Sequence, residues 1–209
     1  MGKKLVRACF EKMRFDVVTI FPELIDAWSK IGVSGGAFSK RIAELICWNP
    51  RKFCESKRGD VDDRPYGGGP GMVMLAQPLK KTLEAINQTN KKNKKKVIFF
   101  SPTGKKIEQN LIEKIIHQQQ RISQYILICG RYEGVDQRFI DLFVDETWSL
   151  GDFVNSGGEL AAMVLMDAVI RRLPGTLGNQ NSSVNDSFMN GLLDFPHFSK
   201  PEIFESISV

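Results

Sequence analysis

Three glycine-rich segments in this sequence could together form a small-molecule site. SPTG, at residues 101–104, follows the apolar run VIFF, and CGRYEG, at residues 129–134, follows the apolar run YILI. LGDFVNSGGE, at residues 150–159, is a third glycine-rich turn, and it leads into a helical pattern. Turns at the carboxyl ends of parallel strands meet at the edge where open α/β sheets bind ligands. The sequence therefore predicts that these loops converge on one ligand.

The loops carry none of the usual phosphate-binding signatures. A Walker A loop requires G-x-x-x-x-G-K-[ST], and a dinucleotide loop requires G-x-G-x-x-G. The segment PYGGGPG at residues 65–71 satisfies neither pattern, because Met72 occupies the last glycine position and no Lys-Ser/Thr pair follows. A nucleoside-like cofactor without phosphates fits better, since backbone N–H and C=O groups could read its base edge. An enzyme acting on nucleotide phosphates is the weaker alternative.

The PYGGGPG segment has two interpretations. Three glycines flanked by prolines can adopt positive φ and approach a ligand closely, but the same residues can form a tight structural turn. Asp62 and Asp63, directly before it, could bind a cation or cap a turn. The whole of residues 51–72 is long and polar, and loops of this length within a compact domain are usually functional or disordered.

Short apolar runs and helical spacing alternate along the chain. Strands are predicted at residues 14–20, 45–48, 97–100 and 125–129, and helices at residues 36–45, 78–86 and 106–117. This alternation predicts an α/β fold with a parallel sheet flanked by helices. Residues 158–173 form a helix that is apolar almost all round and needs burial on more than one side. A homodimer interface and a central position in a monomer would both supply that burial.

Composition narrows the class of protein further. The chain is 42% hydrophobic and 25% charged, with a formal net charge of +5, which suits one globular core and is compatible with an RNA partner or simply with solubility. The basic run at residues 91–96 is either a solvated loop or an RNA contact. Scattered cysteines fit a reducing cytosol, and two distant histidines give little support for zinc. No apolar run approaches the roughly 20 residues that span a bilayer, so no membrane association is expected.

The order and spacing of eight segments resemble the bacterial tRNA (guanine-N1)-methyltransferases. These segments are MRFDVVTIFPE, GVSGGAF, VDDRPYGGGPGM, SPTGKK, CGRYEGVDQR, GDFVNSGGELAAM, LPGTLGN and DSFMNGLLDFPHFSKPE. The resemblance implies the SPOUT superfamily, whose α/β fold contains a deep C-terminal trefoil knot, and a cytoplasmic homodimer. It also implies S-adenosyl-L-methionine as cofactor and tRNA as substrate, with methylation of N1 of the guanosine 3′ of the anticodon, position 37.

The resemblance also assigns site residues. The cofactor-binding positions would be Phe99, Phe100, Ser101, Pro102, Gly130, Tyr132, Glu133, Ser149, Leu150, Gly151, Phe153, Asn155, Gly157 and Gly158. The substrate-binding positions would be Asp62, Pro70 and Gly71, in and before the PYGGGPG segment, which would form a wall for the target base. Mg²⁺ is implied only by the family, with Asp62 or Glu133 as contributors, and no metal-binding set is predicted from the residues.

Two residues take catalytic roles under this resemblance. N1 of guanine carries a proton, so a base must remove it as the methyl group arrives, and general-base assistance is typically worth about 10²–10⁴-fold. Asp186 matches that base and would act in the site of the other subunit, while Arg171 would stabilise charge on O6. From the residues alone, Asp186 would only begin a helix before SFMNGLL and Arg171 would pair with Asp167 at i, i+4. Arg172 is a rival to Arg171.

The resemblance divides the chain and shows two departures. Residues 1–12 would be an N-terminal extension, 13–176 the knotted domain, 177–190 a linker, and 191–209 a remnant of a small helical tRNA-binding domain. Arg58-Gly59-Asp60 replaces a His-Arg pair usual in the family, and the sequence ends in SISV where family chains continue into a basic helical domain. Two hypotheses follow: an active methyltransferase, or a catalytically silent cofactor-binding dimer that has lost tRNA docking.

Overall fold

A five-stranded parallel sheet organises the protein. The computed structural model describes residues 12–90, 94–178, 186–189 and 191–208. The strands pair in the order β2-β1-β6-β5-β7, and every pairing in this sheet is parallel. Their bounds are Met13–Val18 for β1, Ala43–Trp48 for β2, Lys95–Lys106 for β5, Gln124–Ile128 for β6 and Glu146–Ser149 for β7. The predicted α/β class with a parallel sheet flanked by helices is therefore confirmed.

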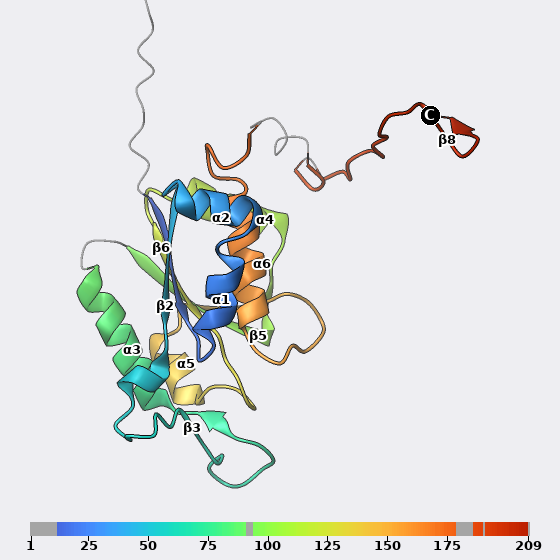
Figure 1. Ribbon diagram of the computed structural model, residues 1–209. Helices are drawn as coiled ribbons and strands as arrows, with labels where there is room; N and C mark the ends of the chain where they lie inside the picture. The colour runs from blue at the N-terminus through green and yellow to red at the C-terminus, as the bar shows by residue number, and fades with distance from the viewer. Residues whose placement is uncertain (1–11, 91–93, 179–185, 190, 209) are drawn as a thin grey trace, which may run out of the picture.

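Helices cover both faces of this sheet (Figure 1). One layer holds α1 (Pro22–Trp28), α2 (Gly32–Ser39), α4 (Gln109–His117) and α6 (Glu159–Ile170), and the other holds α3 (Ala76–Thr89) and α5 (Gln137–Phe143). The short 3-10 helix η1 (Pro50–Phe53) follows β2. Two small hairpins join β3 (Asp62–Asp63) to β4 (Val73–Met74) and β8 (Ile203–Phe204) to β9 (Ile207–Ser208).

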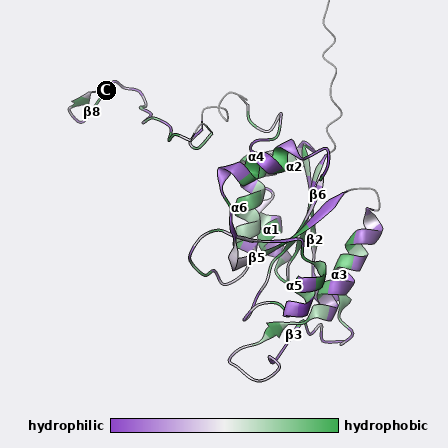
Figure 2. Cartoon of the chain, turned by 180° about the vertical axis from the view of Figure 1, so that it is seen from behind, coloured by the Kyte–Doolittle hydropathy of each residue, from purple (hydrophilic) through white to green (hydrophobic). Residues whose placement is uncertain are grey.

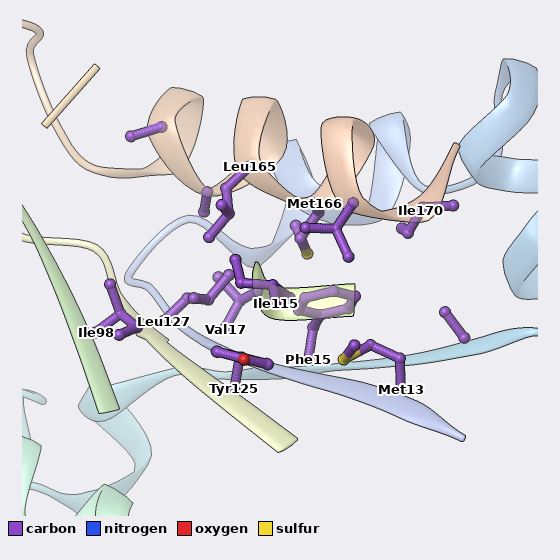
Figure 3. Packing of buried hydrophobic residues seen from close by; sticks show 14 of the residues in the cluster. Met13, Phe15, Val17, Ile98, Ile115, Tyr125, Leu127, Leu165, Met166 and Ile170 are labelled. Carbon is purple, nitrogen blue, oxygen red and sulfur yellow. The ribbon is translucent and has the colours of Figure 1, made fainter. Parts of the chain in front are cut away.

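Side-chain alternation along β1 divides the core into two layers. Met13, Phe15 and Val17 point towards α6, where they pack below Leu165, Met166 and Ile170 (Figure 3). Val18 belongs to the second cluster, with apolar residues of α3 and α5. A strand buried on both faces in this way holds its carboxyl end rigidly, so the loops that follow the strands have fixed starting points.

Helix α6 is the central helix of its layer. Its buried residues are Glu159, Ala161, Ala162, Leu165, Met166, Val169 and Ile170, and it contacts α1, α2 and α4. Figure 2 shows its apolar colouring against the mixed colouring of α3. Leu160 and Val164, one turn apart, nevertheless remain about half exposed, at 48% and 51%. The core therefore supplies burial on several sides of the helix and leaves one apolar strip uncovered.

Sheet pairing shortens two of the predicted helices. The helix expected at residues 36–45 ends at Ser39, because Arg41 adopts a left-handed φ of 57° and Ala43 starts a strand that pairs with Met13 of β1. The helix expected from residue 106 starts only at Gln109, since Lys106 still pairs with Ser149 of β7. In both places sheet pairing overrides helical spacing. Helices α1 and α5 and strand β7 were not predicted from the sequence.

Several expectations stay predictions after this description. The arrangement of helices and strands does not by itself test the trefoil knot or the proposed domain boundaries. Residues 1–11 of the expected extension, and residues 179–185 and 190 of the expected linker, lie outside the described residues. Among the residues that are described, no helix is long and apolar enough to cross a membrane.

Candidate active site

The three glycine-rich loops do converge, at the carboxyl edge of the sheet. They enclose a cavity of about 310 Å³, which lies within the range of roughly 300–1,000 Å³ typical of small-molecule sites. Thirteen of the fourteen predicted cofactor positions line it: Phe99, Phe100, Ser101, Pro102, Gly130, Tyr132, Glu133, Ser149, Leu150, Phe153, Asn155, Gly157 and Gly158.

The first of these loops is not a simple turn after a strand. Pairing between β5 and β7 shifts register between Phe100 and Lys105, so SPTG bulges out of β5 and the strand then resumes. Gly104 allows that return, because a Cβ there would lie 2.6 Å from the backbone nitrogen of Trp148. The bulge directs Ser101 and Pro102 into the cavity wall.

Gly151 is the one predicted cofactor position outside the lining, and six lining residues were not predicted. Gly151 does not line the cavity; its backbone N–H donates to Ser149 Oγ at 3.1 Å, and its carbonyl accepts from the same hydroxyl at 3.0 Å, so it shapes the turn. The missed residues are Arg131, Gly134, Trp148, Val154, Ser156 and Ala161. Trp148 could have been found only by recognising β7, and Ala161 only by noticing that the first turn of α6 faces the loops.

The lining suits a ligand without phosphates. Aromatic and aliphatic side chains such as Phe99, Trp148 and Leu150 alternate with the backbone of the glycine loops. Arg131 is the single Lys or Arg among the described lining residues, and its guanidinium already bonds to the carboxylate of Glu159. The cavity therefore offers backbone donors and acceptors and an apolar surface, which fit a nucleoside, and no unpaired cation for a phosphate group.

The PYGGGPG segment stands beside this cavity. The Glu133 N–H donates to the Met72 carbonyl at 2.9 Å, and the Met74 N–H donates to the Gly134 carbonyl at 2.9 Å, which joins the two loops. Gly71 lies against Glu133, because a Cβ on Gly71 would be 2.6 Å from Glu133 Cγ. Gly71 and its neighbour Pro70 flank the cavity without lining it.

Tyr132 connects the same wall to Asp62. Burial, followed by a hydrogen bond to Asp62, raises the pKa of the Tyr132 phenol above its ordinary value. Arg51 Nη2 donates to the Tyr132 hydroxyl at 3.4 Å, and Arg51 Nη1 donates to the Gly59 carbonyl at 3.0 Å. Of the three predicted substrate positions, Asp62 thus contacts a lining residue, although none of the three lines the cavity itself.

The predicted catalytic pair meets, but elsewhere. Arg171 Nη1 donates to Asp186 Oδ2, and the two side chains are 38% and 28% exposed. Asp167, the alternative partner of Arg171, instead accepts from Ser34 Oγ at 2.6 Å. The structure thus replaces the expected i, i+4 pair with an ion pair to Asp186.

The rival arginine is held by another helix. Arg172 bonds to Glu113 of α4 through Nε at 2.9 Å and through Nη2 at 3.1 Å. Its side chain is only 14% exposed, against 38% for Arg171. Of the two arginines, Arg171 is therefore the one better placed to meet a substrate.

The predicted catalytic pair and the cavity lie at opposite ends of α6. Gly158 and Ala161 line the cavity at the start of the helix, whereas Arg171 caps its end. Twelve helical residues rise about 18 Å, so the length of α6 separates Arg171, to which Asp186 is bonded, from the residues that line the cavity. Within the described residues no cluster of three or more His, Cys, Asp or Glu side chains could hold a metal ion.

Comparisons with known proteins agree with this geometry. The family model described as tRNA (Guanine-1)-methyltransferase TrmD matches residues 13–209. A tRNA (guanine-N(1)-)-methyltransferase of Herminiimonas arsenicoxydans is 49% identical over 203 residues, covering 94% of this chain and 79% of the relative. One from Shewanella halifaxensis is 50% identical over 197 residues, covering 94% and 77%.

A solved structure extends the agreement to the fold. The crystal structure of tRNA (m1G37) methyltransferase from Aquifex aeolicus matches with a TM-score of 0.77 and 34% sequence identity. The match covers 95% of this chain and 81% of the other. Because the family model spans nearly the whole chain and the relatives share about half of its residues, this chain belongs to the tRNA (guanine-N1)-methyltransferase family.

Proposed function

We propose that this protein transfers a methyl group from S-adenosyl-L-methionine to N1 of the guanosine at position 37 of tRNA. The observation that carries the proposal is the cavity at the carboxyl edge of the sheet, which is built from the three glycine-rich loops and has no unpaired cation in its described lining. S-adenosyl-L-methionine is a nucleoside without phosphates, and it supplies the methyl group when bound. The reaction takes place where tRNA is found, in the cytoplasm.

The residues that bind the cofactor and the residues that act on the guanine lie in two different places on the chain. Backbone groups around Gly130 and Gly158 hold the nucleoside, while Phe99 and Leu150 exclude water from it. Asp186 takes the proton from guanine N1, and Arg171 stabilises the negative charge that develops on O6. The target base must leave its stack to reach the methyl group.

A second copy of the chain completes this arrangement. Asp186 is bonded to Arg171, and α6, which is about 18 Å long, separates Arg171 from the cavity of its own chain, so Asp186 would serve the cavity of a partner. The uncovered strip formed by Leu160 and Val164 begins beside the cavity and continues along α6. Phe153 and Val154, 56% and 83% exposed, extend this apolar surface over the cavity loop. Association through these residues in a two-fold dimer would bring each catalytic pair near the other chain's cavity.

The first test measures binding and transfer in one sample. S-adenosyl-L-methionine is titrated by calorimetry, and methyl transfer is then assayed with tRNA carrying guanosine or adenosine at position 37. Binding, with transfer only to the guanosine tRNA, is the expected result. Binding without transfer would instead favour a silent cofactor-binding dimer, and absence of binding would contradict the proposal.

A mixing experiment tests whether Asp186 acts across the dimer. Asp186→Asn removes the base, and Asn155→Trp fills the cavity from a surface loop, so each variant alone should be inactive. Exchange between equal amounts of the two variants should restore about a quarter of wild-type activity, because half of the dimers are mixed and each has one intact site. No recovery, with mixed dimers present by mass spectrometry, would show that Asp186 acts in its own chain.

Mg²⁺ and the domain division complete the proposal. Glu133 lines the cavity and Asp62 hydrogen-bonds to the lining residue Tyr132, and a dependence of the transfer rate on added Mg²⁺ that disappears in Glu133→Gln would assign the ion to this place. Residues 13–176 form the catalytic unit, and residues 191–209 begin the part that contacts tRNA. Deleting residues 191–209 should therefore raise the KM for tRNA and leave S-adenosyl-L-methionine binding unchanged.

A further inference from the structure

A buried carboxylate joins three separate segments under the cavity. Glu159, the first residue of α6, is 0% exposed. Its Oε1 accepts from Thr19 Oγ1 at 2.7 Å, and its Oε2 accepts from Arg131 Nε and Nη2, both at 2.9 Å. Thr19 follows β1, and Arg131 lies in the loop after β6. The carboxylate thus holds two of the sheet's central strands to the start of α6.

These contacts close into a ring. The Thr19 hydroxyl, while donating to Glu159, accepts from the Phe21 N–H at 2.9 Å. The ring of Phe21 in turn lies against the Arg131 guanidinium, 4.6 Å from its centroid to Cζ, at a distance that favours a cation–π contact. Arg131 Nη1 also donates to the Ser156 carbonyl at 3.1 Å and so reaches the third glycine-rich loop.

The two glycines beside Glu159 are shaped around this ring. A Cβ on Gly157 would lie 2.2 Å from Arg131 Nε, and a Cβ on Gly158 would lie 2.7 Å from the Cys129 Cα. The Gly158 N–H donates to the Gly130 carbonyl at 3.0 Å. The Arg131 guanidinium therefore fills the space between the loops at residues 130–134 and 155–158. Both loops line the cavity.

We propose that Glu159 and Arg131 are positioning residues that set the distance between these two loops and thereby the affinity for the nucleoside cofactor. Neither side chain needs to touch the reacting atoms. The guanidinium is committed to Glu159, Ser156 and Phe21, and the carboxylate lies beneath the cavity lining rather than in it. Loops that are held in their bound conformation cost less to order when the ligand binds, so a clamp on both loops should have a measurable effect on affinity. This inference rests on the proposed function for the identity of the ligand.

The test compares two buried carboxylates. Glu159→Gln keeps the shape of the side chain and removes its charge, leaving Arg131 without its counter-ion. The matched control is Asp16→Asn on β1: Asp16 is also 0% exposed and paired with an arginine, Arg14, at 2.7 Å, but it lies outside the cavity lining. Both variants should lower the melting temperature, because each leaves a buried cation unpaired.

Only the first variant should alter the cofactor site. Glu159→Gln should raise the Kd for S-adenosyl-L-methionine by about 10–100-fold and leave the KM for tRNA and the rate at saturating cofactor close to wild type. Asp16→Asn should keep the wild-type Kd. An unchanged Kd in folded Glu159→Gln, or an equal rise in Asp16→Asn, would overturn the proposal. If Glu159→Gln does not fold, Thr19→Val, which removes one side of the ring, replaces it.

Hydrogen exchange gives a measurement that does not depend on the ligand. In the free protein, Glu159→Gln should speed exchange of amides at residues 130–134 and 155–158, including the Gly158 N–H, while Asp16→Asn leaves these segments protected. Unchanged exchange in Glu159→Gln would overturn the clamp even if the cofactor were a different molecule. Absence of S-adenosyl-L-methionine binding in the wild type, with faster exchange in Glu159→Gln, would instead contradict the proposed function alone.

Discussion

The two ends of α6 are built in different ways. At its start, Glu159 is fully buried and bonded to two other segments, and the surrounding loops enclose a cavity. At its end, Arg171 and Asp186 form a partly exposed pair, and Asp186 comes from a segment 15 residues further along the chain. At the first end, residues of one chain alone form the cavity. The second carries the predicted catalytic pair, which lies outside the lining of that cavity, and this is why the proposed site combines opposite ends of two helices.

Removing the base should have the largest effect. Asp186→Asn should lower the rate constant for methyl transfer about 10²–10⁴-fold, because guanine N1 would keep its proton as the methyl group arrives. The Kd for S-adenosyl-L-methionine should stay within about twofold of wild type, since the cofactor is held by the glycine-rich loops and Asp186 acts on guanine N1. Single-turnover assays and calorimetry on the same preparation measure both quantities. A rate near wild type would assign the base to another residue.

The next largest effect should distinguish the roles of the two neighbouring arginines, Arg171 and Arg172. Arg171→Ala should lower the transfer rate by about 10²–10³-fold, as removal of a group that stabilises charge in a transition state does. Arg172→Ala should mainly reduce the free energy of unfolding, by about 1–3 kcal/mol, because it leaves Glu113 without its charged partner. Single-turnover rates and urea denaturation distinguish the two. If Arg172→Ala showed the larger rate loss, the assignment of Arg171 would be wrong.

The smallest effect is a change in how stability depends on pH, and it tests the burial of Cys129 near the start of α6. Burial, followed by the charge of Glu159, raises the pKa of the Cys129 thiol well above 9.0. The folded state therefore favours the neutral thiol, which stabilises the protein fully below pH 9 and less as the pH rises above it. One such group changes the free energy of unfolding by up to about 1.4 kcal/mol per pH unit. Cys129→Ala should reduce the slope of stability between pH 9 and 10, measured by denaturation, and an equal slope would contradict the burial argument.

The sequence predicted the start of α6 much better than its end. Strands that are apolar on both faces and glycine turns after them were enough to predict that three loops meet around one cavity, because these signals are local. The individual residues, such as Phe99, Gly130 and Gly158, came from the family resemblance. Arg131 was missed since its partner, Glu159, is 28 residues away and its role depends on how the loops pack. The boundaries of α2 and α4 failed for a related reason: strand pairing, which joins distant residues, decided them.

The catalytic pair shows what sequence spacing alone cannot supply. Helical spacing favoured Asp167 as the partner of Arg171, but Asp167 bonds to Ser34 of α2 and leaves Arg171 available. Only the family resemblance pointed to Asp186. A local pattern can rank neighbours on one helix, whereas the choice between them depends on tertiary contacts.

The ring around Glu159 also affects the order in which the protein matures. Thr19 and Glu159 are 140 positions apart, so the hydrogen bond between them forms only after most of the chain has been synthesised. Contacts this distant in sequence require closure of a long loop and form late in folding. A ribosome-bound nascent chain can pair β1 with β2 long before α6 has emerged, but it cannot yet capture the cofactor. Binding of the methyl donor is therefore expected only when the fold is complete, and it can be used to follow the last step of folding.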